Sequence, residues 1–129
     1  MSGECILIIE DNQKNLKLIR DILQFHGYTT LEAETAEIGI ELARKLQPAL
    51  ILMDVQLPGM DGREALKILK SGAGTQHIPI IALTAFAMKG DRERLLAEGF
   101  DGYVSKPIDI KEISQVIESY LSRTPANKL

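Results

Sequence analysis

Five polar side chains that could do chemistry follow short apolar runs of this 129-residue sequence. They comprise three carboxylates, one hydroxyl and one ammonium group. Short, continuously apolar runs are typical of buried strands. Where parallel strands share a sheet, their carboxyl ends meet at one edge, so residues at these ends converge there. The five are Glu10, Asp11, Asp54, Thr84 and Lys106.

Such a cluster predicts a cation site and phosphoryl chemistry. Two carboxylates 4 Å apart repel each other by about 4 kcal/mol at an effective dielectric constant near 20. A bound cation or an added proton relieves this repulsion, and oxygen ligands beside a substrate phosphate are typical of Mg²⁺. A carboxylate can also attack a phosphoryl group to give an aspartyl phosphate. Asp54 is the predicted nucleophile, Lys106 suits a phosphoryl oxygen, and Thr84 is expected to donate a hydrogen bond to that group.

The strands that must position these residues are predicted from five runs. The first, third and fourth runs are continuously apolar, which indicates parallel strands buried on both faces. The second run alternates more, which favours an edge position. The runs are Cys5–Ile9, Tyr28–Glu32, Leu50–Met53, Ile80–Leu83 and Gly102–Val104.

Helical periodicity fills the segments between the runs. The fourth predicted helix, Lys89–Ala97, is interrupted by Gly90. Thr35 is the predicted N-cap of the second helix, and Asp109 with Glu112 resembles a capping box before the last. The second helix is expected to bury the face formed by Gly39, Leu42, Ala43 and Leu46.

Five strand–helix repeats predict an α/β fold, a doubly wound parallel five-stranded sheet with helices on both faces. One domain would span residues 1–129, with a core of about 5–122 and a short polar tail at 123–129. The only cysteine, Cys5, excludes an internal disulfide and is expected to be a buried hydrophobe.

Charge and hydropathy exclude several classes of function. The net charge is −3, and no basic cluster predicts binding to nucleic acid. No apolar run approaches the ~20 residues that span a bilayer, and the first residues lack a basic region typical of signal peptides. A cytoplasmic protein that contacts neither membrane nor nucleic acid is expected.

Four segments together resemble the receiver domain of two-component response regulators, over about Cys5 to Ser122. The resemblance implies a flavodoxin-like sheet with strand order 2-1-3-4-5. The stretch from Thr84 to Asp91 is also similar to receivers inside hybrid histidine kinases. The four segments are Ile8–Asn12, Ile51–Gly62, Ile81–Ala85 and Gly102–Pro107.

The resemblance implies a function for the acidic cluster. Asp54 would accept a phosphoryl group from a phosphohistidine of a sensor histidine kinase or a phosphotransfer protein. Asp11 would bind Mg²⁺ directly, or Mn²⁺ as a substitute, with Glu10 acting through water and the Gln56 backbone carbonyl as a further ligand. Lys106 would pair with the phosphoryl group.

The resemblance also implies a conformational switch. Thr84 and Tyr103 would move together on phosphorylation, and Pro107 would follow a cis peptide bond. The fourth helix, fifth strand and fifth helix would form the surface for a downstream protein. Gln56 and Phe86 occupy positions that modulate dephosphorylation. The protein would be a monomer or a weak, phosphorylation-dependent dimer, and no enzyme beyond its own phosphotransfer and autodephosphorylation.

Two alternatives remain open from the sequence. The chain could be a receiver cut from a hybrid histidine kinase or a larger regulator. It could also be an aspartyl-phosphate phosphatase, but this class commonly needs a second acid two residues after the nucleophile, to protonate the leaving group. Gln56 stands at that position and cannot act as an acid.

Overall fold

A computed structural model of the chain describes residues 4–85 and 89–121. Strands and helices alternate throughout these residues. The strands are β1 (Cys5–Ile9), β2 (Thr29–Ala33), β3 (Leu50–Asp54), β4 (Ile80–Thr84) and β5 (Gly102–Ser105). The helices are α1 (Gln13–Phe25), α2 (Ala36–Leu46), α3 (Gly62–Ser71), α4 (Lys89–Glu98) and α5 (Ile110–Leu121).

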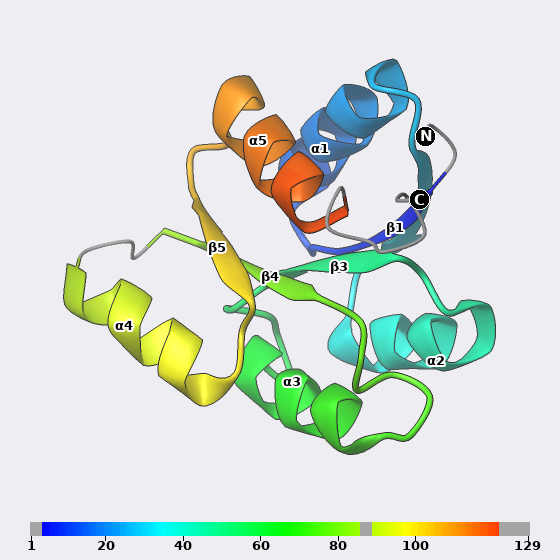
Figure 1. Ribbon diagram of the computed structural model, residues 1–129, viewed down its shortest axis with the longest axis vertical. Coiled ribbons are helices and arrows are strands. Elements are labelled where there is room, and N and C mark those ends of the chain that lie inside the picture. Colours follow the sequence, from blue (N-terminus) through cyan, green and yellow to red (C-terminus); the bar gives the residue numbers. More distant parts are fainter. Residues whose placement is uncertain (1–3, 86–88, 122–129) are drawn as a thin grey trace, which may run out of the picture.

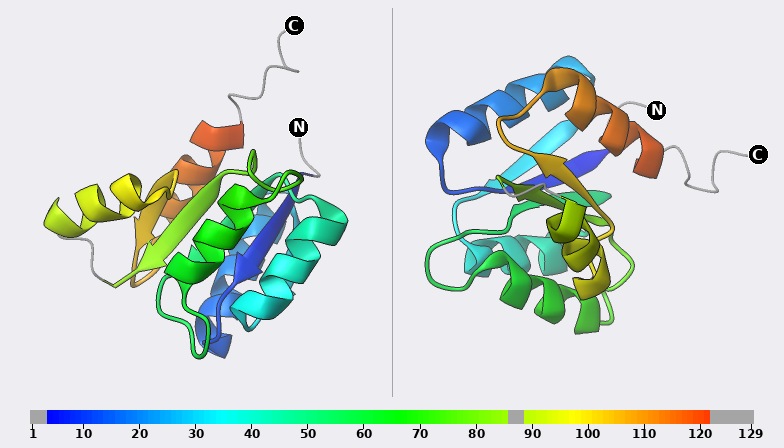
Figure 2. Two further views of the ribbon diagram at one scale, coloured as in Figure 1. Left: turned by 90° about the horizontal axis from the view of Figure 1, so that it is seen from below. Right: turned by 90° about the vertical axis from the view of Figure 1, so that its left-hand side faces the viewer.

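The five strands form one parallel sheet in the order β2-β1-β3-β4-β5. This order confirms the predicted fold class, and β2 lies at an edge as its alternating pattern indicated. Asp54 pairs in register with Leu83, and Thr84 pairs with Ser105. The strands point the same way (Figure 2), so their last residues lie together at the carboxyl end of the sheet.

Helices cover both faces of the sheet (Figure 1). Helices α1 and α5 lie on one face, where their buried leucines and isoleucines pack with Ile6, Ile8 and Leu52. Helices α2, α3 and α4 lie on the other face, against Leu7 and Ile9. Alternate residues of β1 therefore serve two separate cores, which explains why its apolar run is unbroken.

Side-chain caps fix where the chain turns away from the sheet. Each cap oxygen accepts a hydrogen bond from a backbone N–H of the first helical turn, at 3.0–3.2 Å. The Thr35 and Asp109 caps agree with the sequence prediction. The caps of α1, α2, α3 and α5 are Asn12, Thr35, Asp61 and Asp109.

A glycine brings α3 against the end of β3. A Cβ atom added at Gly62 would lie 2.6 Å from the Asp54 carbonyl oxygen and 2.8 Å from the Val55 Cα. Both atoms belong to the backbone, so neither can move aside cheaply. Gly62 therefore sets the close packing of α3 on the segment that carries Asp54.

Several element boundaries differ from the prediction by one residue. Strand β2 begins and ends one residue later than predicted, and α4 extends to Glu98. Strands β3, β4 and β5 each continue one residue further, so that Asp54, Thr84 and Ser105 complete their strands. These polar residues belong to the strands because their backbone groups still pair with residues of the neighbouring strands.

Two burial predictions were wrong. Leu46 was expected on the buried face of α2 but is 53% exposed, because the face against β1 is centred on Ala36, Gly39, Ile40 and Ala43. Cys5 is half-buried, because it begins β1 at the rim of the sheet. Burial still raises the pKa of its thiol.

Candidate functional site

Three carboxylates meet at the carboxyl end of the sheet. Oxygen atoms of Glu10, Asp11 and Asp54 lie within 4.8 Å of one another. Glu10 follows β1 and is fully buried, Asp54 completes β3 and is 4% exposed, and Asp11 is exposed. The fold therefore brings together three acidic residues that the strand-end argument predicted to converge.

One lysine bridges the two buried carboxylates. The Lys106 Nζ atom lies 2.8 Å from Asp54 Oδ2 and 3.3 Å from Glu10 Oε1. It reaches them from the loop after β5, where its backbone N–H donates to the Thr84 carbonyl at 2.8 Å. The peptide bond between Lys106 and Pro107 is cis. A charge-assisted hydrogen bond of this length restricts the orientation of the Asp54 carboxylate.

Backbone N–H groups hold the other oxygen of each buried carboxylate. The Asn12 N–H donates to Glu10 Oε2 at 3.1 Å, and the Gln56 N–H donates to Asp54 Oδ1 at 3.0 Å. Both donors lie two residues beyond the carboxylate that they bind. These local bonds orient the carboxylates before any ligand arrives.

The crowded charges alter the protonation of this site. Burial raises the pKa of Glu10 to about 7, and the charge of Asp54 adds to the rise, while the Asn12 N–H and Lys106 oppose it. Burial lowers the pKa of Lys106, but the hydrogen bond to Asp54 and the negative charges of Asp54 and Glu10 outweigh burial and raise the pKa overall. Lys106 is therefore protonated at neutral pH. The ionised form of Glu10 is destabilised by burial and by the charge of Asp54.

The arrangement fits a hard divalent cation. Glu10 Oε1 is buried and accepts no hydrogen bond from the described residues, although Lys106 is nearby. A buried oxygen in this state has a lone pair available for a cation or a bridging water. An all-oxygen set with a buried Asp and an exposed Asp matches the ligand preference of Mg²⁺.

Replacing Glu10 with glutamine tests this reading of the cluster. At pH 8 without divalent ions we expect Glu10→Gln to raise Tm by roughly 3 °C, about 1 kcal/mol, because a neutral amide is cheaper to bury beside Asp54. Mg²⁺ at a hundredfold excess over Kd is expected to stabilise the wild type by about 2.7 kcal/mol, and we expect a smaller gain in the variant. Thermal unfolding with and without Mg²⁺ measures both effects.

Glu32→Gln is the matched control. Glu32 lies on β2, away from the cluster, and forms an ion pair with Arg20 of α1 at 3.1 Å. Its response to Mg²⁺ should equal that of the wild type. A Glu10→Gln protein that is less stable without Mg²⁺, yet gains as much from it as the wild type, would contradict the repulsion argument.

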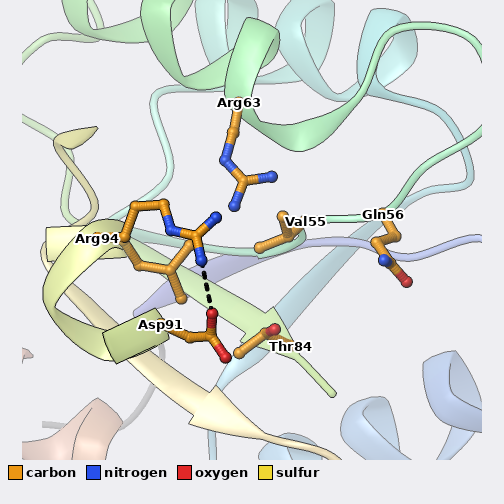
Figure 3. Close-up of a pocket in the computed structure, with 7 residues that line it drawn as sticks. Val55, Gln56, Arg63, Thr84, Asp91 and Arg94 are labelled. Carbon is orange, nitrogen blue, oxygen red and sulfur yellow. Dashed lines mark hydrogen bonds and ion pairs between the residues drawn. The ribbon is translucent and has the colours of Figure 1, made fainter. Parts of the chain in front are cut away.

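Thr84 lies beside the cluster, at the border of a cavity of about 300 Å³. The hydroxyl-bearing side chain is 4% exposed and completes β4. Figure 3 shows Arg63 and Arg94 extending toward each other above Thr84. The other residues that line the cavity are Val55, Gln56, Asp91 and Leu95.

The remaining predicted site residues lie at the margins. The Gln56 side chain is exposed, and only its backbone N–H contacts Asp54. Tyr103 is half-buried on β5, where it packs against the core beneath α3 and α4. Phe86 lies outside the described residues, so the structure gives no position for it.

Sequence reasoning missed the arginines around α4. Arg63 on α3 pairs with Glu98 at 2.7 Å, and Arg94 pairs with Asp91 at 2.8 Å. The second pair has helical i, i+3 spacing that could have been noticed. The first joins residues 35 positions apart, and no local pattern signals it. At the charged start of α4, the Arg92 guanidinium lies over the ring of Tyr103, a contact between two elements that no local pattern signals.

Comparisons with known proteins agree with this geometry. The family model of the response regulator receiver domain matches residues 6–118. The polar-differentiation response regulator DivK of Brucella ovis is 47% identical over 116 residues, which cover 90% of this chain and 94% of the relative.

Solved structures share the same fold. The receiver domain of the sensor histidine kinase PA1611 from Pseudomonas aeruginosa, with a magnesium ion coordinated in its active site cleft, is 32% identical, with a TM-score of 0.86 over 94% of this chain and 99% of that one. A response regulator structure from Chloroflexus aurantiacus is 25% identical, with a TM-score of 0.88 over 95% and 100%. In the described part of the chain, no helix is long and apolar enough to cross a membrane. The chain belongs to the response regulator receiver domain family, and its role lies in two-component signalling.

Proposed function

We propose that Asp54 accepts a phosphoryl group from a phosphohistidine of a histidine kinase or a phosphotransfer protein, and that the modified domain changes its affinity for other proteins. One observation carries this proposal. The Asp54 carboxylate is buried, held by a backbone N–H and by Lys106 at 2.8 Å, and adjacent to two further carboxylates. This arrangement fits the transfer of a phosphoryl group to a carboxylate.

The transfer step is an in-line displacement at phosphorus. An Asp54 oxygen forms a bond to phosphorus while the bond from phosphorus to the donor imidazole nitrogen breaks. The departing nitrogen keeps the electron pair and takes up a proton, and Asp54 becomes an acyl phosphate. Lys106 donates to the transferring oxygens, and the orientation of Asp54 is already set by the Gln56 N–H.

Divalent metal would occupy the acidic cluster during this transfer. Asp11 and Asp54 would hold Mg²⁺, or Mn²⁺ in its place, with the buried oxygen of Glu10 acting through water and the Gln56 carbonyl as a further ligand. When bound, the ion supplies positive charge to phosphoryl oxygens. Autodephosphorylation then returns the domain to its resting state, and we expect the exposed Gln56 side chain to influence that rate.

Intact-mass measurement of the wild-type chain tests the proposal. Incubation with a small phosphodonor and Mg²⁺ should add about 80 Da, one phosphoryl group. Fragmentation should place the adduct on the peptide that contains Asp54. Chelation of Mg²⁺ before the donor is added should suppress the adduct. An adduct on any other residue, or none, would contradict the proposal.

Signal output in this proposal runs through Thr84 and Tyr103 to the face formed by α4, β5 and α5. That face would bind a downstream protein in the cytoplasm, with the domain as a monomer or a weak phosphorylation-dependent dimer. We place one domain in residues 1–129, with a core of about 5–122. The buried Thr84 supports this route, because it connects the site with the cavity beneath α4.

Thr84→Ala should separate phosphorylation from response. We expect an adduct of normal mass. In the phosphorylated variant, the equilibrium constant for the activated conformation should fall roughly fivefold, about 1 kcal/mol, because one hydrogen bond to the phosphoryl group is lost. Amide exchange of α4 and β5 with and without phosphodonor measures this. Thr75→Ala is the control, because the Thr75 hydroxyl is also buried but donates to the Leu69 carbonyl. A full exchange response in Thr84→Ala would refute the proposed route.

A further inference from the structure

An arginine of α4 contacts the proposed switch tyrosine. The Arg92 guanidinium carbon lies 5.4 Å from the centre of the Tyr103 ring. A guanidinium at this distance is attracted to the negative face of an aromatic ring. The contact joins the first half of α4 to β5, two elements of the proposed output face.

Helix α4 has few buried side chains with which to hold its place. Among residues 90–98, only the Leu95 side chain is buried. The Arg63–Glu98 ion pair holds its last turn to α3. With so little apolar burial, polar contacts contribute a large share of what fixes this helix. The contact between Arg92 and Tyr103 is therefore well placed to influence it.

Tyr103 also lines an open groove. The groove has a volume of about 250 Å³ and lies between β5 and α5. A change in the position of the ring would alter the shape of this groove on the proposed output face. The remaining residues that line it are Gly102, Glu112, Val116, Ser119 and Tyr120.

We infer that Arg92 is a positioning residue that holds the Tyr103 ring in its resting place and so sets the threshold of the switch. This inference rests on the proposed function, in which Tyr103 moves after Asp54 is phosphorylated. Phosphorylation must overcome the attraction between ring and guanidinium. Removing the guanidinium should shift the resting ratio of ring positions about two- to fivefold toward the activated one.

Fluorine NMR of the full chain labelled with 3-fluorotyrosine tests the inference. The sequence has three tyrosines, so Tyr→Phe variants can assign each signal. Spectra are recorded without ligand and with Mg²⁺ and beryllofluoride, a phosphoryl mimic. Without ligand, the Tyr103 signal of Arg92→Ala should move toward the beryllofluoride position of the wild type, and Arg92→Lys should lie between them.

Arg94→Ala is the matched control, because Arg94 lies on the same helix but pairs with Asp91. Its Tyr103 signal should match the wild type. An unchanged Tyr103 signal in Arg92→Ala would overturn the inference, as would equal shifts of all three tyrosine signals, which would indicate general loosening. The spectra without ligand test the role of Arg92 and do not require phosphorylation. A wild-type chain that acquires no mass adduct would contradict the proposed function but would leave these spectra unaffected.

Discussion

Asp54→Asn should abolish the phosphoryl adduct and leave the fold intact. Asparagine has nearly the same shape, and its amide oxygen can still accept the Gln56 N–H that Asp54 Oδ1 accepts at 3.0 Å. The amide is not a competent nucleophile toward phosphorus, so no acyl phosphate can form. Intact mass after incubation with donor and Mg²⁺ should show the unmodified chain only.

The stability of Asp54→Asn should stay close to that of the wild type, because two effects of the substitution oppose each other. Removing one of three carboxylates relieves repulsion with Glu10 but weakens the ion pair with Lys106, so opposing effects of order 1 kcal/mol should leave Tm within a few degrees of the wild type. The Mg²⁺-dependent rise in Tm should shrink, because a ligand is lost. Normal circular dichroism would show that loss of the adduct is not loss of fold.

Asp61→Asn is the control for this experiment. Asp61 caps α3 at the end of the loop that follows Asp54, and asparagine caps helices as well as aspartate does. This variant should acquire the full adduct of about 80 Da. A persistent adduct in Asp54→Asn would require another phosphoacceptor, and Asp11 would be the first candidate because it is exposed beside the cluster.

The strand-end residues were predictable because backbone topology alone brings them together. Once five apolar runs are arranged as parallel strands, Glu10, Asp54 and Thr84 must lie at one edge, and the register confirms that arrangement. Lys106 follows for the same reason. The alternating run of β2 indicated an edge position, and the observed strand order places β2 at an edge.

Side-chain contacts between helices were not predictable in this way. Arg63 meets Glu98 only because α3 and α4 pack on the same face, and the sequence carries no periodic signal across their separation. The exposure of Leu46 likewise depends on how closely Ala36, Gly39 and Ala43 let α2 approach β1. The complete burial of Glu10 depends on three-dimensional packing too, although its chemistry was evident from its type.

Lys106→Ala should slow phosphorylation about a hundredfold without eliminating it. Lys106 is the one described cation within reach of both buried carboxylates, at 2.8 Å and 3.3 Å. In the proposed function it neutralises charge on the transferring phosphoryl oxygens, and removing one such donor typically costs about 10²–10³ in rate. Asp54 itself remains, so the adduct of about 80 Da should still form at long times.

Lys70→Ala separates this electrostatic role from a structural one. Lys70 is also a partly buried lysine paired with an aspartate, Asp101, at 2.9 Å, but its pair braces the start of β4 through the Ile80 N–H. Both variants should lose stability, whereas only Lys106→Ala should lose phosphorylation rate, followed as the initial rate of adduct formation at fixed Mg²⁺. Equal rates in the two variants would refute the electrostatic role of Lys106 in phosphorylation. If Lys106→Ala loses rate and a higher Mg²⁺ concentration does not restore it, the charge of Lys106 acts on the phosphoryl group and not through Mg²⁺ binding.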